Sequence, residues 1–204
     1  MTQAVDTRER LLDAAERLFA QEGMAGASLR QITSDAGANL AAVNYHFGSK
    51  LELVRAVIER RLKPINAERL TRLDALEAQP GGPDLRALLS AFLGPALNLG
   101  LRDGREFFVF IARAHSNPSP ELREIVRQEF RVVAARYSAA FHACLPQLSM
   151  EQLMWRVHFV IGALCHTVIN TGLLEEVTNG LCRADDAHVL ERLVDFAFRG
   201  LERV

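Results

Sequence analysis

The sequence has few cysteines and almost no net charge, and each shortage excludes a class of protein. Only three cysteines, Cys144, Cys165 and Cys182, occur in 204 residues, and none belongs to a CxxC pair. An odd, unpaired set excludes a disulfide-based scaffold and favours a reducing compartment, so we expect a cytoplasmic protein. The formal net charge of −1 excludes a diffuse polycation that coats nucleic acid. A small DNA-reading face remains compatible with it, because net charge says little about a local patch.

Catalytic, metal-binding and targeting patterns are also missing. The sequence contains no GxSxG, HExxH, Walker A or dinucleotide-binding glycine motif. His158, Cys165 and His166 lie seven and one positions apart, which does not match the i, i+4 pair of a helical metal site. The first residues lack the basic and then apolar pattern of a signal peptide. We therefore expect neither an enzyme nor a metal site or cofactor.

One apolar stretch invites comparison with a membrane-spanning helix. Residues 157–174 contain no Lys, Arg, Asp or Glu over 18 positions, near the lower limit for crossing a bilayer. The same stretch carries two histidines, a cysteine, an asparagine and two glycines. Polar groups at this density favour a buried or interface helix, so we expect no membrane association.

What the sequence does have is helical spacing. Apolar residues recur at three- and four-residue steps without sustained alternation, so we expect an all-α protein of about nine helices. Capping boxes at residues 6–9, 28–31 and 49–52 predict helix starts, and Asn39 is expected to cap a short helix over residues 40–46. Gly23, Gly37 and Gly48 are expected to end helices. These signals predict a compact three-helix unit over residues 1–48.

Residues 49–204 predict a larger helical body. Pro64 is expected to kink the helix that follows Ser49, and proline-containing breaks at residues 79–83 and 117–120 separate further helices. A long helix is predicted over residues 121–145. Another is expected from Ser149 to about Gly172, followed by an irregular segment over residues 173–183 and a last helix that begins at Asp185.

Residues 28–47 have helix-turn-helix organisation. A capped helix, a turn at Gly37 and a second short helix follow one another. In such units the second helix enters the major groove with its N-terminal residues toward the base edges. The helix before them supplies apolar support.

At these positions the sequence resembles the TetR family of one-component transcriptional regulators. The resemblance runs from about Thr7 to Arg61 and rests on Leu12, Ala14, Ala15, Leu18, Phe19, Gly23, Ser28, Ile32, Ala36, Gly37, Tyr45, His46, Phe47, Ser49, Lys50 and Leu53. It implies a homodimer that binds a palindromic DNA operator as a ligand-released repressor, with residues 49–204 binding the effector and dimerising. Residues 39–50, 155–159 and 162–163 are similar to a subgroup that includes regulators of fatty-acid metabolism.

Ten positions follow as candidates for contact with double-stranded DNA: Ser28, Arg30, Asn39, Leu40, Ala41, Ala42, Asn44, Tyr45, His46 and Lys50. Residues 40–42 can meet thymine methyl groups, and Asn44, where many relatives carry a tyrosine, can bond adenine bidentately. Arg30 can reach a guanine or a phosphate, whereas Ser28 and Lys50 are expected at phosphates. We expect Asn39 to act as a helix cap rather than as a base-reading residue. Residues 45 and 46 either contact phosphate or pack on the next helix.

Residues 1–61 hold eight basic and eight acidic side chains, so the predicted DNA-binding unit is neutral, although such a unit is expected to be basic. Between residues 24 and 50 the only charged side chains are Arg30, Asp35 and Lys50. This segregation predicts few phosphate contacts per subunit and a modest dependence of binding on salt.

Two aromatic stripes in residues 49–204 are candidate walls of an effector pocket, although such stripes more often form core. The candidates are Phe107, Phe110, Ile111, Arg113, His115, Trp155, His158, Phe159, Gly162 and His166. One hypothesis has Arg113 or His115 orient a carboxylate or acyl head group, which makes fatty acids and acyl-CoA candidate effectors. The last two helices, about residues 150–171 and 185–203, are apolar enough to pair across a two-fold axis as a homodimer interface.

Two alternatives stay open. A thiol-based redox sensor that uses Cys165 or Cys182 would keep the DNA-binding function and change the effector. A helical protein-interaction module would keep the fold without binding DNA.

Overall fold

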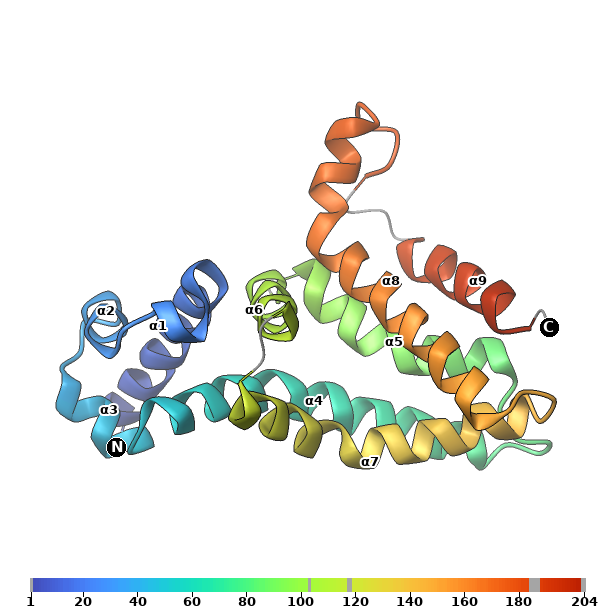
Figure 1. Ribbon diagram of the computed structural model, residues 1–204, viewed down its shortest axis with the longest axis horizontal. Helices are drawn as coiled ribbons and strands as arrows, with labels where there is room; N and C mark the ends of the chain where they lie inside the picture. Colours follow the sequence, from blue (N-terminus) through green and yellow to red (C-terminus); the bar gives the residue numbers. More distant parts are fainter. Residues whose placement is uncertain (1, 103, 117–118, 184–187, 203–204) are drawn as a thin grey trace. The chain divides into compact units, whose positions relative to one another are not determined.

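The computed structural model describes residues 2–102, 104–116, 119–183 and 188–202, with side chains for all of these except residues 2–5 and 113–116. Within these ranges the chain forms nine α-helices and no strand, which confirms the all-α prediction (Figure 1). The helices are α1 (Thr2–Gly26), α2 (Leu29–Asp35), α3 (Leu40–Phe47), α4 (Lys50–Glu77), α5 (Leu85–Arg102), α6 (Arg105–Ser116), α7 (Pro120–Cys144), α8 (Met150–Val177) and α9 (Val189–Glu202).

Helix α1 begins earlier than the sequence pattern predicts. Because the chain is already helical from Thr2, Asp6 lies inside the helix, and the predicted capping box at residues 6–9 is wrong. Gly23 interrupts the helix as expected, with φ 75° and ψ 171°, a conformation that residues with a side chain rarely adopt. Leu12, Ala15 and Phe19 are fully buried, which confirms the predicted apolar face.

The remaining predicted caps of the N-terminal region are present. Ser28 Oγ accepts the Gln31 amide at 3.1 Å, and the Gln31 side chain accepts the Ser28 amide at 2.8 Å. Asn39 caps α3 by accepting a backbone N–H at 3.0 Å, and Ser49 accepts one at 3.1 Å at the start of α4. A second reciprocal box at Ser149 begins α8. Each cap satisfies helix donors that would otherwise lack a partner.

Two helices run through prolines. Pro64 lies inside α4, and Pro95 lies inside α5. A proline lacks an N–H and displaces carbonyls of the preceding turn. In the turn before Pro95, the Phe92 carbonyl accepts a hydrogen bond from Arg69 Nε at 2.8 Å. A side chain of α4 thus bonds a carbonyl beside the proline of α5.

Helix α8 is longer than predicted. It continues past Gly172 to Val177, so the predicted end near Gly172 is wrong, because an isolated glycine weakens a helix without stopping it. Arg156 Nη1 donates to the carbonyls of Gly200 and Leu201 at 3.3 and 2.7 Å, which joins α8 to the last turn of α9. The predicted helix start at Asp185 and the end at residue 203 lie outside the described residues.

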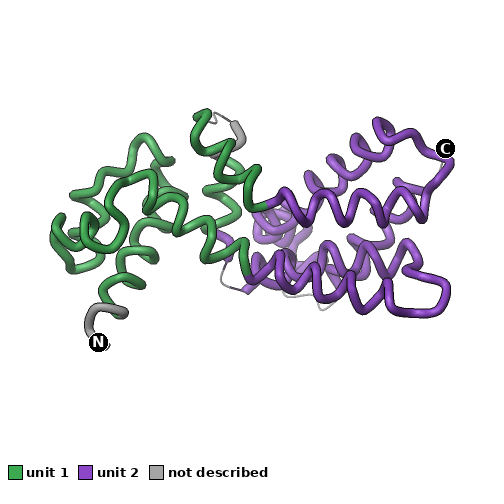
Figure 2. Tube along the Cα trace, turned by 90° about the horizontal axis from the view of Figure 1, so that it is seen from below, with its two compact units in different colours: residues 1–63, 106–129 green, residues 64–105, 130–204 purple. Residues whose placement is uncertain are grey.

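The chain divides into two compact units, shown in different colours in Figure 2. The first comprises residues 1–63 and 106–129, so it holds α1–α3, the first half of α4, α6 and the start of α7. The Phe19 and Phe110 rings meet in its core at 5.4 Å between centroids. These units follow contacts, and the functional boundary at residue 48 stays a prediction.

The second unit comprises residues 64–105 and 130–204. Its core contains Phe92, Tyr137 and Phe141, whose ring centroids lie 5.0 to 6.0 Å apart. Helix α9 packs on α5 and α8. On α5, Gly100 faces Val168 of α8 so closely that a Cβ there would lie 2.4 Å from Val168 Cγ1. The two helices therefore approach each other through a residue without a side chain.

Much of α8 is apolar and exposed. By length and composition it could span a membrane, with a mean hydropathy of 1.6 over its most apolar 18-residue window, of which 22% is buried. Leu153, Val157 and Val160 face the unit's interior, whereas Trp155 and Phe159 are 56% and 64% exposed. The helix thus has one buried apolar side and a second, uncovered one.

Candidate nucleic-acid interface

Helices α2 and α3 carry the candidate DNA-binding surface. Both are too short to be stable alone, so packing must hold them. Ile32 of α2 and Val43 of α3 supply that packing, since both side chains are fully buried. Gly37 has φ 58° and turns the chain between the two helices. The result is a helix-turn-helix whose outer faces can present side chains.

The outer face of α3 is formed by four of the predicted contact residues. Leu40 is 45% exposed and Tyr45 is 80% exposed, and the side chains of Ala41 and Asn44 are exposed beside them. The Asn44 amide forms no hydrogen bond to another described residue, so its donor and acceptor are both available. Ala42 is half-buried, which leaves its methyl group only partly accessible. This face offers an apolar edge and one amide, the chemistry that reads thymine and adenine.

The structure decides one alternative for the aromatic residues of α3. Tyr45 is too exposed to pack on the next helix, and its ring contacts His46 edge-on at 4.9 Å. His46 is half-buried, and its ring lies 6.1 Å from that of Phe47. The phenol is therefore presented outward, and its contact with phosphate stays a prediction.

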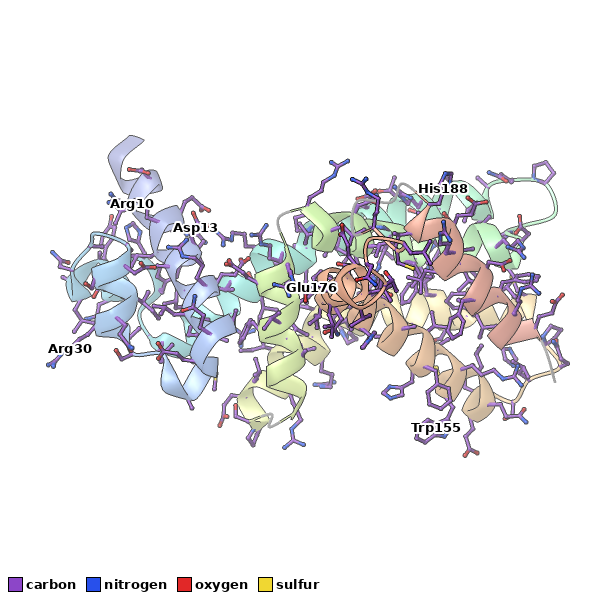
Figure 3. All side chains as sticks on the ribbon, turned by 90° about the horizontal axis from the view of Figure 1, so that it is seen from above. Arg10, Asp13, Arg30, Trp155, Glu176 and His188 are labelled. Carbon is purple, nitrogen blue, oxygen red and sulfur yellow. The ribbon has the colours of Figure 1, made fainter. Side chains whose placement is uncertain are left out.

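Arg30 and Lys50 supply positive charge beside this face. The side chain of Arg30 is exposed, and Figure 3 shows it directed away from the helices. Lys50 is half-buried in the first turn of α4. Within the described part of the chain, neither cation forms an ion pair, so neither positive charge is neutralised locally. Ser28 and Asn39 are exposed, but their side-chain oxygens already accept helix N–H groups.

The neutral charge of this unit is explained by ion pairs elsewhere in it. The Glu16 carboxylate, 2% exposed, binds Arg60 at 2.8 Å and Arg61 at 2.7 Å. Arg60 also binds Asp13 at 2.7 Å, which joins α1 to α4. These carboxylates neutralise arginines of the scaffold rather than Arg30, so a neutral sum coexists with a locally basic α2–α3 face.

Arg60 lies at the centre of this ion-pair cluster. Burial opposes its charge, but hydrogen bonds to Glu16 and Asp13 outweigh that effect, so the pKa of Arg60 is raised above its ordinary value. Its Nε is buried and has no hydrogen-bond partner among the residues that the structure describes. A second ion pair, Arg17 to Asp35 at 2.8 Å, joins α1 to α2 and neutralises the one carboxylate among the charges between residues 24 and 50.

The predicted effector contacts fall into two groups in different compact units. Phe107 and Phe110 of α6 are about 1% exposed in the first unit, and Ile111 is half-buried. Arg113 and His115 lie in α6, but their side chains are outside the described set. The second group, Trp155, His158, Phe159, Gly162 and His166, lies on the exposed side of α8, with Trp155 at its outer edge (Figure 3). Their role in effector binding stays a prediction.

The cysteines and possible metal ligands of the described residues give little support for redox or metal chemistry. Burial raises the pKa of both the Cys165 and the Cys144 thiol, which disfavours the reactive thiolate that a redox sensor needs. No group of three or more His, Cys, Asp or Glu side chains that could hold a metal ion occurs among the described residues.

Two buried charged residues escaped the sequence analysis, although helical spacing could have found them. Glu16 shares the buried face of α1 with Leu12, four residues before it, and Phe19, three residues after it. Arg69 shares the buried face of α4 with Ile65, four residues before it, and Leu73, four residues after it. A charge on an apolar face indicates either a partner or a function.

Comparison with protein families assigns both parts of the chain. Residues 11–57 match the family described as bacterial regulatory proteins of the tetR family. Residues 90–200, more than half of the chain, match the family described as the tetracycline repressor-like C-terminal domain. The first match covers α2, α3 and most of the surface described above.

Curated relatives agree with this assignment. The chain is 39% identical to the HTH-type transcriptional regulator SrpR of Pseudomonas putida over 66 residues. These residues make up 32% of this chain and 31% of SrpR. It is 44% identical over 61 residues to the nicotine-responsive repressor HdnoR of Paenarthrobacter nicotinovorans, covering 30% of this chain and 31% of HdnoR. The chain thus spans about a third of the length of these relatives. The uncharacterised regulator YerO of Bacillus subtilis is 23% identical over 97% of this chain and 66% of its own.

Solved structures share the fold over the whole chain. A transcriptional regulator from Aquifex aeolicus matches with a TM-score of 0.63 at 20% identity, covering 96% of this chain and 98% of its own. The fatty acid degradation regulator FadR of Bacillus halodurans matches with a TM-score of 0.67 at 11% identity, covering 97% of both chains. With family matches in both parts and this fold throughout, the chain belongs to the TetR family of bacterial transcriptional regulators.

Proposed function

We propose that this regulator is a homodimeric, ligand-released repressor whose α3 reads a palindromic operator. The observation that carries the proposal is the exposed Leu40–Tyr45 face of α3, flanked by the unneutralised cations Arg30 and Lys50. Apolar edges and an amide select bases, while the cations attract phosphates. Residues 1–48 are then the DNA-binding part, and residues 49–204 bind the effector and dimerise.

In the proposed complex, the ten predicted residues fall into groups according to whether their side chains can contact bases, can contact phosphates, or are already used as helix caps. Leu40, Ala41 and Asn44 face base edges, and half-buried Ala42 contributes at the margin. Arg30, Lys50 and Tyr45 meet phosphates, with His46 beside them. Ser28 and Asn39 hold the helix N-termini, where their backbone N–H groups favour nearby anions.

The homodimer is proposed to form through the uncovered apolar side of α8 together with α9. Trp155, Phe159 and Phe196 are each more than half exposed, and Met154 and Ile161 are about 40% exposed. Single exposed apolar residues are ordinary, but several of them on two helices that pack together are typical of an interface. A two-fold axis here would present two recognition helices to one face of the duplex. On this proposal, the exposed side of α8 that carries Trp155 and Phe159 forms the dimer interface rather than the wall of an effector pocket.

The effector is proposed to be a small molecule bound in the C-terminal part, with fatty acids and acyl-CoA as candidates. The names of related proteins mention nicotine, fatty acid degradation and choline, so relatives respond to different chemistry. The effector of this chain therefore has to be inferred from its own residues.

The first test is an anisotropy titration of the full chain against DNA from upstream of its own gene, at two salt concentrations. Saturable binding of a dimer, weakened modestly at the higher salt, is the expected result. A random-sequence selection run in parallel recovers the site if the operator lies elsewhere. Failure of both experiments to yield a preferred sequence would contradict the proposal.

A further inference from the structure

Arg69 is a buried cation without a carboxylate partner. Its side chain is 4% exposed on the inner face of α4, and no carboxylate of the described residues forms an ion pair with it. Nε donates to the Phe92 carbonyl at 2.8 Å, and Nη1 donates to Asn66 Oδ1 at 3.3 Å. Nη2 donates to no acceptor in the described part of the chain. Of the five N–H donors of the guanidinium, several are therefore unused.

Leaving this charge unpaired is unfavourable. Burial of a charge without a counter-charge is unfavourable, and burial lowers the pKa of Arg69 to about 10, so the group is still charged at neutral pH. The nearest titratable groups do not compensate it, because burial raises the pKa of Tyr137 to about 12 and raises that of the Cys165 thiol. Both groups are neutral at pH 7.

Two less deeply buried arginines of α4 are neutralised by a carboxylate. Arg60 and Arg61 are more exposed than Arg69, at 21% and 22% of their side chains, yet both bind Glu16. Arg69 is more deeply buried and has only a carbonyl and an amide oxygen. Among these three arginines of α4, Arg69 alone forms no ion pair with a carboxylate of the described residues.

The surroundings of Arg69 are aromatic. The guanidinium lies over the Phe92 ring at 4.5 Å, and Phe92 and Tyr137 lie 5.0 Å apart between centroids. The Tyr137 hydroxyl donates to the Arg69 carbonyl at 2.9 Å, so that proton is already used. A ligand here would meet one positive charge surrounded by apolar surface.

From this geometry we propose that Arg69 is the anion-binding residue of the effector site, and that the effector is an amphipathic monocarboxylate. The inference rests on the proposed function, because it assumes that the C-terminal part binds an effector. A single guanidinium neutralises a single charge, and its planar fork matches a carboxylate. The apolar side chains around the guanidinium favour a ligand with an apolar body. Bonding the Phe92 carbonyl beside Pro95 is the second role of Arg69, and it uses only Nε.

The test uses calorimetric titration of the full chain with octanoate, dodecanoate, hexadecanoate and phenylacetate, each compared with its uncharged alcohol. We expect at least one acid to bind at least tenfold more tightly than the matching alcohol. Arg69→Met should lose that preference at least tenfold, and Arg69→Lys should retain part of it. Arg72→Met is the matched control, because Arg72 lies one turn further along α4. Its side chain is 39% exposed and paired with Glu68, and its loss should leave the preference for the acid unchanged.

Three results would overturn the inference: no acid binds the wild-type chain, acid and alcohol bind equally, or Arg69→Met keeps the preference. If Arg69→Met does not fold, Arg69→Gln decides, since an unchanged preference in that neutral variant contradicts the proposed role of Arg69. Operator binding is measured on the same samples. If the wild-type chain does not bind an operator, the proposed function is contradicted but the Arg69 site is not. If an acid binds at Arg69 without releasing the operator, the site is confirmed but the acid is not the effector.

Discussion

Arg61 holds Glu16 with two guanidinium nitrogens: Nη2 lies 2.7 Å from Oε1, and Nε lies 2.9 Å from Oε2. The carboxylate is almost inaccessible, and it also accepts from Arg60 at 2.8 Å. A buried, bidentate ion pair thereby links α1 to the first half of α4. This ion pair stabilises α1, the helix on which the two short DNA-binding helices pack.

Glu16→Gln should destabilise the chain by about 3 kcal/mol, because it leaves two partly buried guanidinium groups without their counter-charge. Urea denaturation followed by circular dichroism measures the change. Glu9→Gln is the control, since Glu9 is 46% exposed at 3.4 Å from Arg60 and should lose under about 1 kcal/mol. Equal losses in the two variants would mean that burial does not decide the strength of this cluster.

Asn44→Ala and Lys50→Ala should weaken DNA binding in different ways. Loss of the Asn44 amide should remove about 1–3 kcal/mol of discrimination at one base pair of each half-site. Loss of Lys50 should weaken all sequences evenly and reduce the salt slope by about one charge per subunit. Anisotropy titrations against the selected operator and single-base variants separate the two effects. A uniform loss in Asn44→Ala would place Asn44 at the backbone instead.

Gly100→Ala should destabilise the chain by about 1–3 kcal/mol through overpacking, because the new Cβ would meet Val168 at 2.4 Å. The double variant Gly100→Ala with Val168→Ala should recover part of this loss, since the clashing methyl groups are removed. Gly200→Ala is the control, because nothing lies within 4 Å of its added Cβ. Thermal unfolding measures all three, and an unchanged Tm in Gly100→Ala would show that α5 and α8 can separate freely.

Tyr137→Phe should change how stability depends on alkaline pH. The pKa of Tyr137 is raised to about 12, so its stabilising contribution is complete below pH 10 and is lost as the pH rises toward 12. The pKa of Arg69 is lowered to about 10, so its burial penalty is relieved over the same range, with the opposite sign. The variant keeps only the second effect, so its stability should rise relative to wild type between pH 10 and 12. Urea midpoints at pH 9, 10 and 11 measure this difference, and parallel curves would contradict it.

Phe159→Glu should shift the chain from dimer to monomer, since Phe159 is 64% exposed on the apolar side of α8. A charge in the centre of a desolvated interface is costly, and we expect at least a tenfold weaker self-association. Sedimentation velocity over a concentration series measures it. Ala134→Glu, at an exposed position of α7, is the control and should behave as wild type. An unchanged dimer in Phe159→Glu would place the interface elsewhere.

Much of the fold could be predicted from local patterns. The caps at Ser28, Asn39 and Ser49 and the break at Gly23 depend on neighbours within four residues, so the sequence contains the whole interaction. Predictions from local patterns were wrong at two places. Asp6 has the residue type of a cap but follows residues that are already helical, and Gly172 can end a helix but here does not.

The sequence by itself determined the helices, their order and the helix-turn-helix, because hydrophobic period and capping are short-range properties. Only the tertiary structure decided which charges are neutralised. Glu16 meets Arg60 and Arg61 across more than forty residues, whereas Arg30 and Lys50 form no ion pair with any residue that the structure describes. It also decided that, among the described residues, no carboxylate pairs with the buried Arg69 and no residue covers the Trp155 side of α8. Burial and charge pairing join residues far apart in the sequence, so neither follows from spacing along one helix.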